Sequence, residues 1–193
     1  FETAQTYFTY DPLDRRLEFD QIKIVGSDVS FLGQGYAALE MNEAWPDSLF
    51  GQLRFSEAKA NFQNSQPDAV ILDDALVDFR LNLTPFRLDV GQFYVTNSTK
   101  KISVRGQARV NAEALGWSVA LDARTPTLTK AAIMEYWPVG FKPRSRDWVS
   151  KNVKHSKLRD VRFALRVPAS QPTVRDLGFG YAETSLRFTK SWP

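Results

Sequence analysis

Apolar and polar residues alternate along most of this chain, and this alternation constrains the fold more than any other feature of the sequence. A period of two residues is typical of antiparallel strands that are buried on one side only. Runs of this kind recur about ten times, for example over 77–83, 102–110 and 161–167. The pattern predicts a mostly β fold, with a long, twisted antiparallel sheet that curls into an open groove.

Two parts of the sequence also resemble each other. Residues 16–24 align with 87–95 without a gap, and 29–35 align with 102–108 after two residues are inserted in the turn. This similarity indicates a repeated hairpin, as expected of a β array in which each unit packs on its neighbours. We therefore expect one β-rich segment over 1–193, with repeat-like halves at 1–65 and 66–126.

Only one region of the sequence has helical features. A capped stretch begins at Thr127 and ends at Pro138, and a second begins at Pro143 and runs to Val153. These features predict a short two-helix insert near 128–153, within 127–155, followed by closing strands over 156–193. A single insert among strands argues against alternating βαβ units and against a parallel sheet.

The composition excludes several kinds of chemistry. The chain has no Cys and one His, His155, so disulfides, thiol nucleophiles and Cys metal sites are excluded and a Ser-His-Asp triad is improbable. Residues 33–38 fit a G-x-G-x-x-A motif, but Pro46 leaves no room for the helix that a dinucleotide site needs. We expect a chain that is not an enzyme and that has no cofactor and no metal.

The charge is concentrated in one segment. Residues 140–166 contain nine Lys and Arg residues against two Asp residues. The segment predicts a basic patch formed by Lys142, Arg144, Arg146, Lys151, Lys154 and Lys157. Such a patch suits an anionic membrane surface, or is simply a solvated face. No nucleic acid is expected as a partner, because the segment offers few aromatic residues for stacking.

Several short motifs resemble the AsmA-like envelope proteins of Gram-negative bacteria. They are Tyr136-Trp137-Pro138, Pro143, Arg146, Trp148-Val149 and Asn152-Val153, the strand over 158–166, the strand over 184–193, and the opening from Tyr10-Asp11-Pro12 to Leu39. The central domain of unknown function in that family is the part that they resemble. The resemblance spans most of the chain.

The resemblance implies a function without catalysis. AsmA-like proteins are periplasmic, are anchored to the inner membrane and shield phospholipid acyl chains in a β-sheet groove. They serve lipid transport between the membranes and outer-membrane integrity. For this chain the resemblance implies phospholipid acyl chains as ligands, envelope proteins as further partners, and an anchor that lies in another segment.

A sheet that curls without closing has an apolar inner face, which suits acyl chains. The residues expected to line it are Leu17, Phe19, Phe31, Val77, Phe79, Leu81, Leu88, Val90, Val104, Val119, Leu121, Phe163 and Leu165. In the alternative interpretation these residues fill the core of a closed β-sandwich, and the chain is a structural interaction module without a lipid groove.

Overall fold

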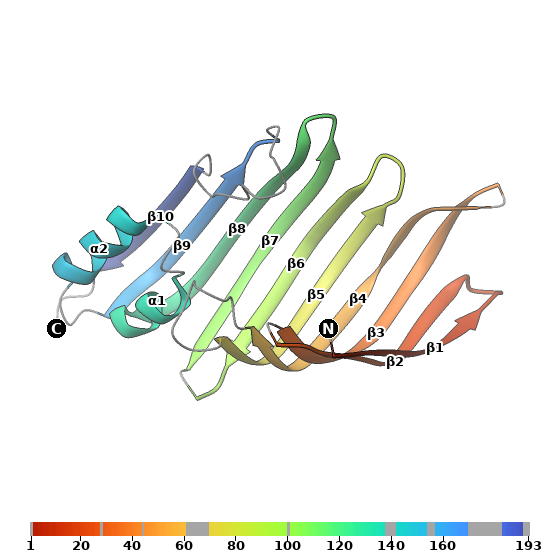
Figure 1. Ribbon diagram of the computed structural model, residues 1–193, viewed down its shortest axis with the longest axis horizontal. Helices are drawn as coiled ribbons and strands as arrows, with labels where there is room; N and C mark the ends of the chain where they lie inside the picture. The colour runs from red at the N-terminus through yellow and green to blue at the C-terminus, as the bar shows by residue number, and fades with distance from the viewer. Residues whose placement is uncertain are drawn as a thin grey trace.

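One antiparallel sheet of ten strands forms the body of the protein (Figure 1). The computed structural model describes residues 2–27, 29–43, 45–60, 70–99, 101–137, 142–153 and 157–169, and the backbone of 183–190. The strands are β1 (Thr3–Asp11), β2 (Arg16–Val25), β3 (Val29–Asn42), β4 (Trp45–Ala60), β5 (Val70–Asn82), β6 (Arg87–Asn97), β7 (Ile102–Glu113), β8 (Gly116–Thr129), β9 (Lys157–Val167) and β10 (Glu183–Lys190). Each strand pairs with the next one along the chain.

The sheet is open. Strands β1 and β10 each pair with one neighbour only, and Figure 1 shows them at opposite ends of the sheet. The predicted mostly β fold with a long antiparallel sheet is confirmed. The alternative of a closed sandwich was wrong, because the described strands form one sheet and not two facing sheets.

The repeated hairpin is present in the register of the strands. Between β2 and β3, Phe19 pairs with Gly35, and the register then shifts so that Ile22 pairs with Gly33. The hairpin of β6 and β7 has the same shift, because Val90 pairs with Ala108 and Phe93 pairs with Gly106. These four residues occupy the positions that align in the sequence with the four residues of the first hairpin. Each bulge adds residues to one strand and bends it, so both halves of the sheet bend at the same point.

The two predicted helices are confirmed. Helix α1 (Lys130–Tyr136) begins after Thr129, whose hydroxyl oxygen accepts a hydrogen bond from the amide of Ala132 at 3.2 Å. Helix α2 (Pro143–Asn152) begins with proline, whose missing N–H would have no partner in a first turn. Figure 1 shows both helices at the end of the sheet that carries β8, β9 and β10.

The helices and strand β9 enclose the main buried apolar cluster of the described residues. Ile133, Val149, Val153, Leu158 and Val161 form it, and Leu158 is only 1% exposed. Outside this cluster, few apolar side chains in the described ranges are fully buried. The helix-covered end of the sheet is therefore packed as a protein core, whereas most of the sheet is not.

Two features of the sheet differ from expectation. The alternation of apolar and polar residues does not predict strand β1, because Thr and Gln interrupt its apolar residues. Trp45-Pro46 reads in the sequence as the end of an element, but β4 begins there and runs for 16 residues. Proline is tolerated in the first residues of a strand, where no ladder hydrogen bond depends on its nitrogen.

Candidate functional site

One face of the sheet is apolar from β2 to β9. All thirteen residues predicted to line a groove lie on it, because they pair across the strands with each other or with other apolar or glycine residues. Phe79, for example, lies between Gly51 of β4 and Val90 of β6. We call this surface the apolar face and the opposite one the polar face.

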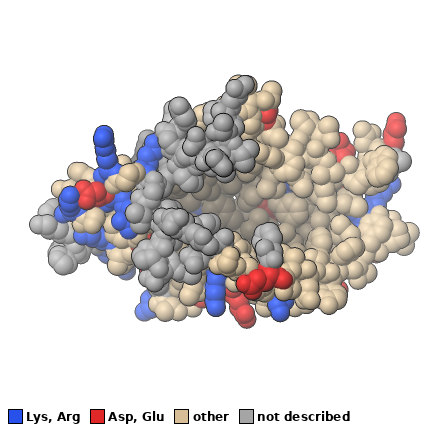
Figure 2. Space-filling model, viewed as in Figure 1, with Lys and Arg blue, Asp and Glu red and all other residues tan. Residues whose placement is uncertain are grey.

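The apolar face is sheltered, although the described helices contact the sheet mainly at β8. They reach β6 through Tyr136 of α1, whose hydroxyl accepts a hydrogen bond from the side-chain amide of Asn97 at 3.1 Å. Each of the thirteen residues is half-buried and none is fully buried. Figure 2 shows a surface that is hollowed along its middle and mostly free of charged residues there. Side chains on a concave sheet converge and shield one another, which contributes to this partial burial.

Small residues allow the strands of the apolar face to come close together. A Cβ atom added at Gly51 would lie 2.0 Å from the carbonyl oxygen of Tyr36, and one added at Gly106 would lie 2.1 Å from that of Asp122. Gly35 has a φ of +147°, which L residues rarely adopt. Glycine at these positions is therefore a requirement of the curved backbone.

The helices close one end of the apolar face. Val161 is two residues before Phe163 on β9, so it shares the apolar face, and it belongs to the cluster that α1 and α2 cover. The hollow thus ends in a packed core at β8 and β9. None of the described helices is long and apolar enough to cross a membrane.

The predicted basic patch is only partly a free surface. Arg144 and Lys151 are exposed on α2, and Lys151 forms an ion pair with Asp147 at 2.7 Å. Arg146 has another role, because its half-buried guanidinium donates to the carbonyl oxygens of Met134 and Trp137 at 3.0 and 3.1 Å. It thereby satisfies the C-terminal end of α1.

The other three residues of the predicted basic patch are Lys142, Lys154 and Lys157. Lys142 is half-buried immediately before α2, with a left-handed backbone, and Lys157 begins β9. Lys154 and the single histidine, His155, lie outside the described residues.

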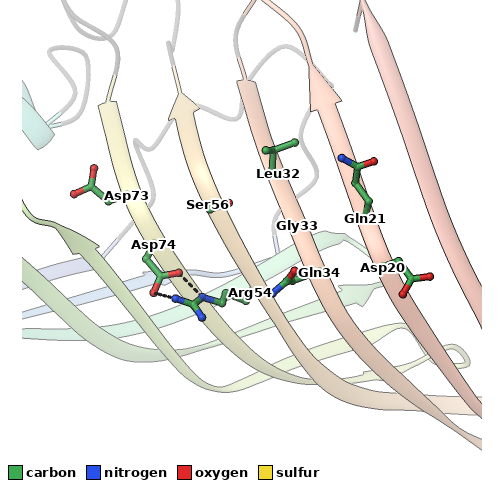
Figure 3. Close-up of a pocket in the computed structure, with 9 residues that line it drawn as sticks. All are labelled: Asp20, Gln21, Leu32, Gly33, Gln34, Arg54, Ser56, Asp73 and Asp74. Atoms are coloured by element: carbon green, nitrogen blue, oxygen red, sulfur yellow. Dashed lines mark hydrogen bonds and ion pairs between the residues drawn. The ribbon is translucent and has the colours of Figure 1, made fainter.

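The polar face carries ion pairs across neighbouring strands. Arg54 of β4 donates to Asp74 of β5 at 2.8 Å, beside a depression of about 590 Å³ that also includes Asp20 and Gln21 (Figure 3). Within the described part of the chain, no group of three or more His, Asp or Glu side chains is placed to hold a metal ion.

Asp89 is the most enclosed acid of these ion pairs, with a side chain 24% exposed. Burial by itself would raise the pKa of Asp89, but hydrogen bonds and charges from Arg87 and Arg109 outweigh it, so the pKa is lowered. Both arginines lie within 2.6 Å of its carboxylate oxygens. The contact with Arg109 joins β6 to β7, and the contact with Arg87 lies within β6.

This arrangement predicts a defined pH dependence. The pKa of Asp89 is lower in the folded protein than in the unfolded chain. The ion pairs of Asp89 therefore stabilise the fold fully at pH values above the unfolded-state pKa. This stabilisation is lost as the pH falls through the folded-state pKa. Asp89→Asn is expected to lower the free energy of unfolding near neutral pH, measured with urea, and to have a smaller effect at about pH 3.

The matched control is Asp160→Asn. Asp160 pairs with Arg162 at 3.2 Å, but both side chains are more than half exposed, so little stability depends on the pair. An Asp89→Asn effect of equal size at both pH values would contradict the assignment.

Comparisons of the chain with protein-family models, with curated proteins and with solved structures find no match.

Proposed function

We propose that the apolar face binds the acyl chains of phospholipids and shields them from water, as a groove that carries or holds lipid and not as an enzyme. The observation that supports this most is an apolar face that is continuous from β2 to β9 and half-buried, with no second layer of described residues over most of its length. A surface of this size left to water would be unusual for a soluble protein.

The chemistry of the face suits a hydrocarbon ligand. Its lining consists of Leu, Val, Phe and small residues, and no charged residue occupies the apolar-face positions paired from residues 49–55 of β4 to β8. Each methylene group removed from water contributes about 0.8 kcal/mol. A few methylene groups therefore suffice for measurable binding, and the ligand needs no polar recognition within the groove.

The resemblance to AsmA-like proteins leads to the same proposal. In that setting the groove would serve phospholipid transport and outer-membrane integrity in the periplasm, and α2 would face headgroups or a protein partner through Arg144 and Lys151.

Native mass spectrometry of the gently extracted chain tests the proposal. We expect adducts with phospholipid masses that disappear after organic extraction. A fluorescent fatty acid should then bind the extracted protein and be displaced by phospholipid, whereas glycerophosphate, which has no acyl chain, should not displace it. A bare protein mass together with no binding of the fatty acid would overturn the proposal.

A further inference from the structure

Arginines on the polar face usually lie beside an acid on a neighbouring strand. Arg54 pairs with Asp74 at 2.8 Å, Arg109 with Asp89 at 2.5 Å, and Arg166 with Asp122 at 2.8 Å. Cross-strand pairs of opposite charge stabilise a sheet, whereas like charges directly opposite each other destabilise it. The sequence thus places a counter-charge across the strands at these positions.

One row of the polar face breaks this rule. Arg105 of β7 pairs with Arg124 of β8, and Arg124 pairs with Arg162 of β9. The backbone of β10 places position 187, also arginine, opposite Arg162. Four successive strands therefore carry arginine in the same register. We call Arg105, Arg124 and Arg162, which line one depression, the arginine row.

Arg105 and Arg124 have no acidic ion-pair partner among the described residues. Asp122 lies beside them, but Arg166 holds both of its carboxylate oxygens at 2.8 Å. Arg162 contacts Asp160 at 3.2 Å, in a pair exposed to solvent.

The row lines a depression of about 530 Å³ on the polar face. Gln92 of β6 and Gln107 of β7 lie in the same depression and add amide donors beside the guanidinium groups. Neighbouring strands are about 4.8 Å apart, so the three arginine positions extend over about 10 Å. Guanidinium groups bind phosphate oxygens through two parallel hydrogen bonds, and a row of them fits several phosphate oxygens at once.

We propose that the arginine row is a binding site for a ligand with more than one phosphate group, separate from the apolar face. A bound polyphosphate anion would supply the counter-charge that the protein does not provide for Arg105 and Arg124. The phosphates can come from the headgroups of an anionic membrane surface or from a soluble phosphorylated molecule. This site does not depend on the acyl-chain groove, because it lies on the opposite side of the sheet.

Inorganic tripolyphosphate is the probe for the site, with binding measured by calorimetry on the whole chain. Replacing Arg105 and Arg124 together by Gln should weaken binding roughly tenfold or more, since hydrogen bonds to charged groups are lost. The control is Arg54→Gln, an arginine on the same face that already has an acid partner, and its affinity should stay within about twofold of the wild type.

Stability gives a second readout. Because the double substitution removes like-charge repulsion, it should not lower the melting temperature, whereas tripolyphosphate should raise the melting temperature of the wild type and not of the double variant.

Flotation with vesicles of phosphatidylcholine and phosphatidylglycerol distinguishes the two sources of the phosphate groups. Vesicle binding that tripolyphosphate competes away identifies headgroups, and tripolyphosphate binding without vesicle binding identifies a soluble ligand.

Equal tripolyphosphate affinity in the wild type and the double variant would overturn the proposal. So would binding to nucleic acid without binding to tripolyphosphate. If the apolar face does not bind acyl chains, these expected outcomes stay the same. The failure of one proposal is therefore distinguishable from the failure of the other.

Discussion

Gly106→Ala is expected to lower the free energy of unfolding by about 3 kcal/mol, because the added methyl group has no space. Its carbon would lie 2.1 Å from the carbonyl oxygen of Asp122 and 2.6 Å from the ring of Phe93. The oxygen belongs to the β8 backbone, so the clash can be relieved only by moving β7 and β8 apart. Urea unfolding, followed by the loss of β-sheet circular dichroism, measures the effect.

Gly91→Ala is the matched control in the same hairpin. A Cβ atom at Gly91 would meet no atom within 4 Å, and Gly91 lies at the bulge of β6. Alanine there should change the free energy of unfolding by less than about 1 kcal/mol in either direction. If both substitutions lower the free energy of unfolding by the same amount, the close approach of β7 to β8 is not the reason that position 106 requires glycine.

Phe79→Glu is expected to reduce acyl-chain binding roughly tenfold or more, since losing contact with two methylene groups costs about 1.6 kcal/mol. Phe79 lies in the middle of the apolar face, beside Gly51 and Val90. A carboxylate there would face hydrocarbon without a partner, which is unfavourable for the bound state in particular. Because the position is only half-buried, water can reach the carboxylate in the lipid-free protein, and the fold should persist.

The control is Leu76→Glu on the same strand. Leu76 lies on the polar face, where it pairs with Arg54 and with Tyr94, so a carboxylate at this position lies on the opposite side of the sheet from the apolar face. Titration of a fluorescent fatty acid into the three proteins compares them directly. Equal loss of binding in both variants would show that the effect comes from general destabilisation and would argue against the apolar face as the binding surface.

Much of the sheet could be predicted because its signals are local. The alternation of β3 and β7 determines which side chains share a face, and the parity shift at Ile22 indicates the bulge of β2 before any coordinates are known. The cap at Thr129 and the proline at 143 mark the helix starts in the same local way. The thirteen residues of the apolar face follow from alternation alone.

The remaining features depend on registers that alternation does not determine. The arginine row joins positions 105, 124 and 162, which are far apart in the sequence and meet only through two successive strand pairings. Arg146 reads as one of several surface cations, and its contacts with α1 depend on how the two helices pack. Strand β1 lacks a strong pattern because the edge of a sheet needs little burial.

The order of the strands in the sheet also determines how the protein unfolds. Each strand pairs only with its neighbours along the chain, so the ladders between strands can form in sequence without closing long loops. Stability is then close to a sum of contributions from adjacent strands, as in linear repeat proteins. Opening can begin at β1 and progress inward while the helix-covered end at β8 and β9 stays folded. A curled sheet of this kind can thus widen from one end to admit a ligand without unfolding as a whole.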